Sequence, residues 1–99
     1  MDNMEREMSL AEEYNQQGRV LYSMDKYEDA IGFYLKAESA DPMYLQTYFN
    51  LTESYVMLDR FDDAKKALKR AQLLNKENGE ILKEESLDVL TFIGRMVQH

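Results

Sequence analysis

The residue types that carry most enzymatic and metal chemistry are missing from this chain, or nearly so. It has no cysteine, and its single histidine is the last of 99 residues. These absences exclude a disulfide framework, a thiolate nucleophile and a zinc site built on sulfur. There is no glycine-rich turn to hold a phosphate group, and the carboxylates lie at positions typical of helix caps or solvated faces. We therefore expect neither an enzyme nor a protein that carries a cofactor or a metal ion.

Residues that break helices are also scarce. One proline and four glycines stand among many helix-forming residues, which favours an all-α chain. The N-terminus is charged, and no run reaches the roughly 18 apolar residues of a membrane helix. We therefore expect no signal peptide, no membrane segment and a cytoplasmic location. The net charge of −7 disfavours nucleic acid as a partner, because lysine and arginine dominate binding to a phosphate backbone.

One stretch of the chain occurs twice. Residues 25–37 are echoed 34 positions later by residues 59–71, with the acidic start, the following aromatic residue and two alanines in phase. The correspondence extends upstream, where Tyr14 matches Tyr48. A fixed period of this length indicates repeated helical hairpins.

Each unit resembles the tetratricopeptide repeat. The residues that carry the resemblance are Tyr14, Gly18, Ala30, Tyr34, Ala37 and Pro42 in the first unit, and Tyr48, Tyr55, Ala64 and Ala71 in the second. The departures from the family pattern are Gln17, Leu21, Thr52, Leu68 and Lys76. The resemblance implies one domain, residues 1–99, folded as a right-handed α-α superhelix of five helices. The repeats would cover about residues 9–42 and 43–76, followed by a capping helix over about residues 77–97.

Cap signals predict where the helices begin. Ser9 and Glu12 form a capping box for the first helix, which should end near Met24. Gly18 lies inside that helix and is expected where a neighbouring helix passes too close for a side chain. The expected caps of the four later helices are Asp25 in a second capping box with Glu28, Asp41 before Pro42, Asp59, and Asn75.

The resemblance also implies a binding site. Tetratricopeptide arrays bind extended or helical peptides in a concave groove that is lined by the first helix of each unit. Carried over by spacing, the groove residues are Asn15, Arg19, Tyr22, Phe49, Asn50, Glu53, Met57 and Glu84, with Glu12, Gln16 and Gln46 beside them. Of the clamp with which one subclass holds a chaperone's C-terminal carboxylate, only Asn50 agrees. The acidic residues favour a protein partner with a basic or apolar segment; the alternative is a shallow groove of solvated side chains.

The last helix is more apolar than a cap requires. Beside its main apolar stripe, Leu87, Leu90 and Val97 form a second apolar side. A partner helix, or a second copy of the chain in a homodimer, would bury this side. Alternatively, Leu87 and Leu90 fold back onto the fourth helix within one subunit.

A basic cluster of Lys65, Lys66, Lys69 and Arg70 occupies the expected outer face of the fourth helix, where a solvated surface is the simpler interpretation. The sequence thus predicts a non-catalytic adaptor, scaffold or assembly module that binds a protein segment in its groove or on its last helix. The alternative is a structural protein that associates with itself through the last helix.

Overall fold

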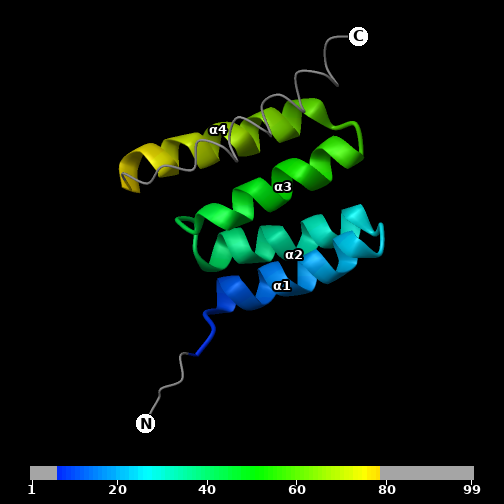
Figure 1. Ribbon diagram of the computed structural model, residues 1–99, viewed down its shortest axis with the longest axis horizontal. Helices are drawn as coiled ribbons and strands as arrows, with labels where there is room; N and C mark the ends of the chain where they lie inside the picture. The colour runs from blue at the N-terminus through cyan, green and yellow to red at the C-terminus, as the bar shows by residue number, and fades with distance from the viewer. Residues whose placement is uncertain (1–6, 79–99) are drawn as a thin grey trace.

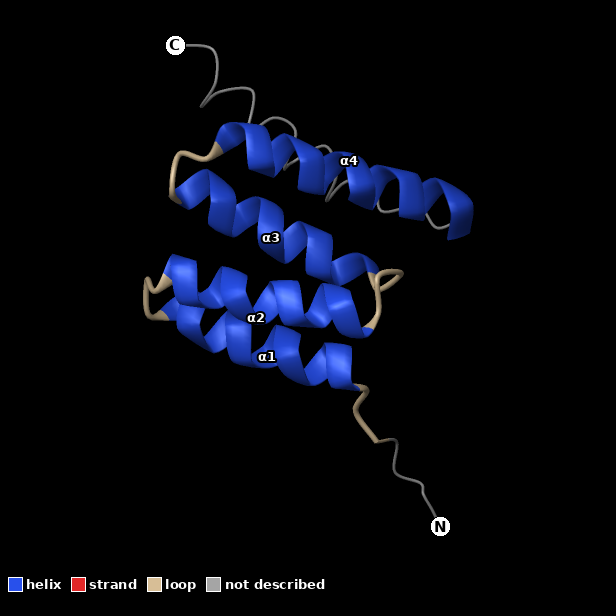
Figure 2. Ribbon diagram, turned by 180° about the vertical axis from the view of Figure 1, so that it is seen from behind, coloured by secondary structure: helices blue, strands red, loops and turns tan. Residues whose placement is uncertain are grey.

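The computed structural model describes residues 7–78 of the chain. Within this range there are four α-helices and no strand: α1 Leu10–Ser23, α2 Tyr27–Ala40, α3 Leu45–Met57 and α4 Phe61–Asn78. Figure 1 shows the helices stacked in chain order with neighbours antiparallel, and Figure 2 shows the same stack from behind. α2 packs against both α1 and α3, α4 packs against α3, and α1 makes a smaller contact with α3. The prediction of an all-α chain is confirmed for these residues.

The start of α1 follows the predicted capping box. Ser9 N donates to Glu12 Oε1 at 2.8 Å, and Glu12 N donates to Ser9 Oγ at 3.1 Å. Two backbone donors that the helix cannot satisfy are thereby paired reciprocally. The C-cap of this helix is Met24, as the sequence predicts.

Asp25 and Asp59 do not cap the following helices as predicted. Both have a positive φ, 62° and 59°, and each lies just after the end of the preceding helix. They occupy the left-handed position that usually holds glycine in a Schellman motif. The N-cap of α2 is Lys26, which makes no capping hydrogen bond through its side chain.

The two hairpin turns repeat each other bond for bond. Lys26 N donates to Leu21 O at 2.9 Å, and its counterpart 34 residues later, Arg60 N, donates to Tyr55 O at 2.8 Å. The preceding amides of Asp25 and Asp59 likewise donate to carbonyls in the last turn of their helices. The period seen in the sequence is therefore present in the backbone.

The connection between α2 and α3 also differs from the prediction. Asp41 Oδ1 accepts from Met43 N at 3.0 Å, which closes an Asx turn around Pro42. As a result α3 begins only at Leu45, with Tyr44 as its N-cap, and Pro42 lies in the connection and not in the first helical turn. The Pro42 carbonyl accepts a hydrogen bond from Tyr48 Oη at 2.7 Å.

α4 runs past the residue that was expected to open a fifth helix. Asn75 lies inside α4, which continues to Asn78. The apolar stripe continues there through buried Ala71 and Leu74, and no proline or glycine interrupts it. The described residues therefore contain four of the five predicted helices, and the predicted capping helix lies outside them from residue 79 onward.

The core lies between the helices and is closed by small residues. Ala30 and Ala37 of α2, and Ala64 and Ala71 of α4, have no exposed surface, which lets the helices approach closely. A Cβ on Gly18 would lie against the Tyr34 ring, 2.7 Å from Cδ1 and 2.9 Å from Cζ. The prediction that Gly18 is a packing glycine is confirmed, with an aromatic ring of α2 as its neighbour.

No helix between residues 7 and 78 combines the length and the hydropathy needed to cross a bilayer.

Candidate functional site

A groove lies between α1 and α3, the helices that were predicted to carry the binding residues. Its pocket has a volume of about 290 Å³. Most of the lining side chains are polar and uncharged, and four of them are amides. The lining residues are Met8, Glu12, Asn15, Gln16, Arg19, Tyr44, Gln46 and Asn50. We call this the α1–α3 groove.

Two buried asparagines form the floor of the groove. Asn50 Nδ2 donates to Asn15 Oδ1 at 2.7 Å, and Asn15 Nδ2 donates both to Thr47 Oγ1 at 2.8 Å and to Ala11 O at 2.9 Å. All these groups are buried. Buried polar groups that are paired in this way are held in fixed positions, because breaking any bond would leave an unsatisfied donor or acceptor. The floor of the groove is therefore preorganised.

Arg19 joins the floor to the rim. Its Nη1 donates to Asn50 Oδ1 at 3.3 Å and to Glu53 Oε1 at 3.0 Å, and its guanidinium lies 5.6 Å from the centroid of the Tyr22 ring. Burial, and then the nearby carboxylate of Glu53, raises the pKa of Tyr22. The pair of Arg19 and Glu53 is about half exposed, so it orients side chains more than it stabilises the fold.

Tyr34 lies buried beneath this network. Its hydroxyl is without a hydrogen-bond partner among the described residues. Burial raises the pKa of Tyr34 from 10.0 to about 12; the positive charge of Arg19 opposes this rise, and the negative charge of Glu53 adds to it. The ring supports α1 at Gly18, so the same side chain fixes the distance between α1 and α2.

The structure brings most of the predicted groove residues together. Asn15, Arg19, Tyr22, Asn50 and Glu53 form one connected set on α1 and α3.

Two predicted positions on α3 behave differently from that set. Phe49 is only 4% exposed and belongs to the core, so its ring offers little surface to a partner. Met57 is exposed at the end of α3 and does not line the groove. The remaining predicted residues lie outside the described part of the chain: Glu84 of the groove, and Leu87, Leu90 and Val97 of the possible oligomer face.

Three residues of the site were not assigned to it from the sequence. Nothing in the sequence marks Thr47 as a site residue, because a threonine in a helix has no characteristic pattern. It nevertheless accepts the hydrogen bond that orients Asn15. Met8 and Tyr44 also line the groove. Because neither lies within a described helix, helical spacing did not apply to them.

Between residues 7 and 78, no group of three or more histidine, cysteine, aspartate or glutamate side chains could hold a metal ion. The groove instead offers fixed amide and carboxylate groups. Such groups pair with the N–H and C=O groups of an extended peptide backbone.

Comparison with known proteins gives no match, whether by family model, by curated sequence or by solved structure.

Proposed function

We propose that the chain is a non-catalytic protein-interaction module of the tetratricopeptide type, an adaptor, scaffold or assembly protein that binds a protein segment in the α1–α3 groove. The observation that carries this proposal is the buried pair of Asn15 and Asn50, which holds a polar floor in place. A preorganised floor loses little side-chain entropy on binding, so its contacts contribute more of their energy to affinity.

The repeat geometry supports this class of fold. The hairpin turns at Asp25 and Asp59 have the same dihedral signature and the same hydrogen bonds at a spacing of 34 residues. An array of equivalent hairpins rotates by a constant amount at each step, and so forms a superhelix with a concave face. A cytoplasmic location fits the proposal, since a chain without cysteine gains nothing from an oxidising compartment.

The partner is a protein segment with basic or apolar side chains. Gln16 and Gln46 are exposed on opposite sides of the groove and present amides to a bound backbone. The ionised residues of the groove are Glu12, Arg19 and Glu53, and the arginine is paired with Glu53. Two of these three residues are acidic, which favours a positive segment.

The experiment starts from short random peptides selected on the immobilised chain. The enriched peptide is then titrated into labelled protein while amide NMR shifts are recorded. We expect the largest shifts near Gln16 and Gln46, and we expect Gln16→Arg with Gln46→Arg to weaken binding by about tenfold or more through charge repulsion. The arginine at position 46 can still donate to Asn50 Oδ1, as Gln46 Nε2 does at 3.1 Å, so the floor is preserved.

The matched control is Gln17→Arg with Gln72→Arg. It changes the same residue types and the same total charge at exposed positions that do not line the groove. The proposal is wrong if this control weakens binding as much as the groove variant, or if the shifts gather away from α1 and α3. Far-ultraviolet circular dichroism of both variants establishes that each remains folded.

A further inference from the structure

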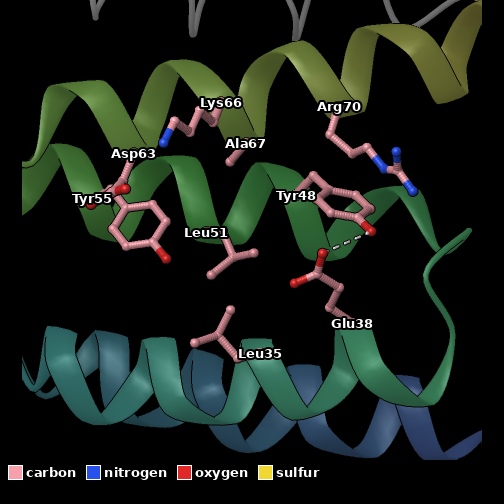
Figure 3. Close-up of a pocket in the computed structure, with 9 residues that line it drawn as sticks. All are labelled: Leu35, Glu38, Tyr48, Leu51, Tyr55, Asp63, Lys66, Ala67 and Arg70. Atoms are coloured by element: carbon pink, nitrogen blue, oxygen red, sulfur yellow. Dashed lines mark hydrogen bonds between the residues drawn. The ribbon is translucent and has the colours of Figure 1, made fainter.

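A second and larger pocket lies on the side of α3 that faces away from the α1–α3 groove. It has a volume of about 460 Å³ and is walled by α2 and α4, with α3 as its floor. It exists because α2 and α4 both pack against α3 and make no contact with each other in the described part of the chain. We call it the α2–α4 groove; Figure 3 shows the side chains that line it.

The middle of this groove is apolar. In Figure 3, Leu35 of α2 and Leu51 of α3 point toward one another, with Tyr55 on one side and Tyr48 on the other. Leu35 is 43% exposed although it lies in the middle of a helix. Ala67, on the α4 wall, has a side chain too short to cover it. A large apolar side chain from another molecule would fill this space and remove Leu35 from water.

The rim of the groove carries two carboxylates, Glu38 and Asp63, and two cations, Lys66 and Arg70. Asp63 is paired with Arg60 at 3.0 Å, and Glu38 lies near Arg70 at the other end, where the Arg70 guanidinium is 5.9 Å from the Tyr48 ring centroid. Lys66, whose side chain points toward the Asp63 end in Figure 3, forms no hydrogen bond or ion pair with any described residue.

Two further cations, Lys65 and Lys69, lie on the same helix but do not line the groove. Residues 65–70 include four cations and no acidic residue, although the chain as a whole has a net charge of −7. The sequence alone suggests a solvated face here, yet Lys66 and Arg70 line a pocket. Lys66 and Arg70 beside an apolar floor are complementary to carboxylates that flank an apolar side chain.

We propose that the α2–α4 groove binds a partner protein through a segment in which a large apolar side chain is flanked by aspartate or glutamate. The apolar side chain inserts over Leu51 between the two tyrosines, and the carboxylates pair with Lys66 and Arg70. This site is distinct from the α1–α3 groove and prefers a segment of the opposite charge.

The test uses two capped synthetic peptides and the full chain. One peptide sets a leucine and a phenylalanine among aspartate and glutamate residues, and in the other lysine replaces every acidic residue. We expect the acidic peptide to bind, with amide NMR shifts that gather around Leu35, Leu51 and Lys66. The proposal is overturned if the basic peptide binds this face equally well, or if the acidic peptide shifts Gln16 and Gln46 instead.

Two pairs of variants separate the site from general charge attraction. Lys66→Glu should weaken binding of the acidic peptide by about tenfold, and Lys65→Glu, the same change one residue away on an exposed side, by less than about twofold. Leu35→Asp should also weaken binding, and Leu10→Asp, at a 54% exposed leucine on α1, should not. Equal effects within either pair overturn the proposal.

A second copy of the chain is the competing occupant. Light scattering over a range of protein concentrations tests it. A dimer that Leu35→Asp converts to monomer would overturn the proposal, because the groove would then be filled by the chain itself. A mass that Leu35→Asp leaves unchanged supports an external partner.

Discussion

Replacing Gly18 with alanine should destabilise the protein, although alanine is the better helix former. Alanine in place of glycine inside a helix stabilises it by roughly 0.5–1 kcal/mol. At Gly18 the added Cβ would lie 2.7 Å and 2.9 Å from two ring atoms of Tyr34, which has no exposed surface and cannot swing outward. Overpacking of this kind costs about 1–3 kcal/mol, so we expect a net loss of about 1–2 kcal/mol.

Gly32 provides the control, because a Cβ there meets no atom within 4 Å. Gly32→Ala should therefore raise the free energy of unfolding by roughly 0.5–1 kcal/mol, and the difference between the two variants measures the steric cost alone. Urea denaturation followed by circular dichroism gives both values. Combining Gly18→Ala with Tyr34→Leu should show a favourable coupling energy, since the smaller side chain makes room for the methyl group. The reasoning is refuted if Gly18→Ala stabilises the protein as much as Gly32→Ala does.

Three further predictions concern the turn and the buried polar groups. Asp59→Gly should stabilise the protein by about 0.5–1 kcal/mol, because glycine adopts a positive φ without steric cost. If Asp59 were instead an N-cap, the same change would cost a few tenths of a kcal/mol, and urea denaturation decides between the two signs. Thr47→Val should cost about 1–3 kcal/mol, because one of the two Asn15 Nδ2 hydrogens loses its acceptor while the other stays bonded to Ala11 O. Thr52→Val, which removes only a donor to a helical carbonyl, should cost less in the same assay. The folded chain holds the Tyr34 proton up to a pKa of about 12 against 10.0 unfolded, so stability is intact below pH 10 and falls as the pH approaches 12. Tyr34→Phe should reduce that fall, and at neutral pH it should be neutral or stabilise by about 1 kcal/mol, since no bond is lost; unchanged pH dependence would contradict this.

The sequence predicted the repeat but misassigned the turns, for a reason that lies in the length of the connection. Asp25 and Glu28 match the sequence pattern of a capping box. An aspartate in the left-handed position after a helix gives the same sequence pattern, so the sequence does not distinguish the two. Only three residues separate α1 from α2. The Schellman motif that ends α1 uses all three of these residues. Lys26 is therefore both the last residue of that motif and the N-cap of α2. Ser9 was predicted correctly because no preceding helix competes for it.

The groove residues of α1 were easier to predict than those of α3. α1 has one buried side, so its polar residues can be assigned by helical periodicity. α3 is the central helix, and 8 of its 13 residues are buried. A single apolar stripe therefore does not describe it, and Phe49, which the spacing placed in the groove, packs in the core. The α2–α4 groove was not predicted because it depends on the separation of two helices that do not touch, which no pattern within either helix records.

α3 contributes to both grooves from nearly opposite sides. At about 100° per residue, Gln46 and Asn50 share one side of the helix, and Tyr48 and Tyr55 lie roughly opposite. No residue lines both pockets, so a segment bound in one groove leaves the other open. The substitutions that test the two proposals likewise share no hydrogen-bond partner, and the effects of such independent changes add. Loss of binding in one groove would therefore not refute the proposal for the other groove, and if both proposals hold, a basic and an acidic segment can bind at the same time.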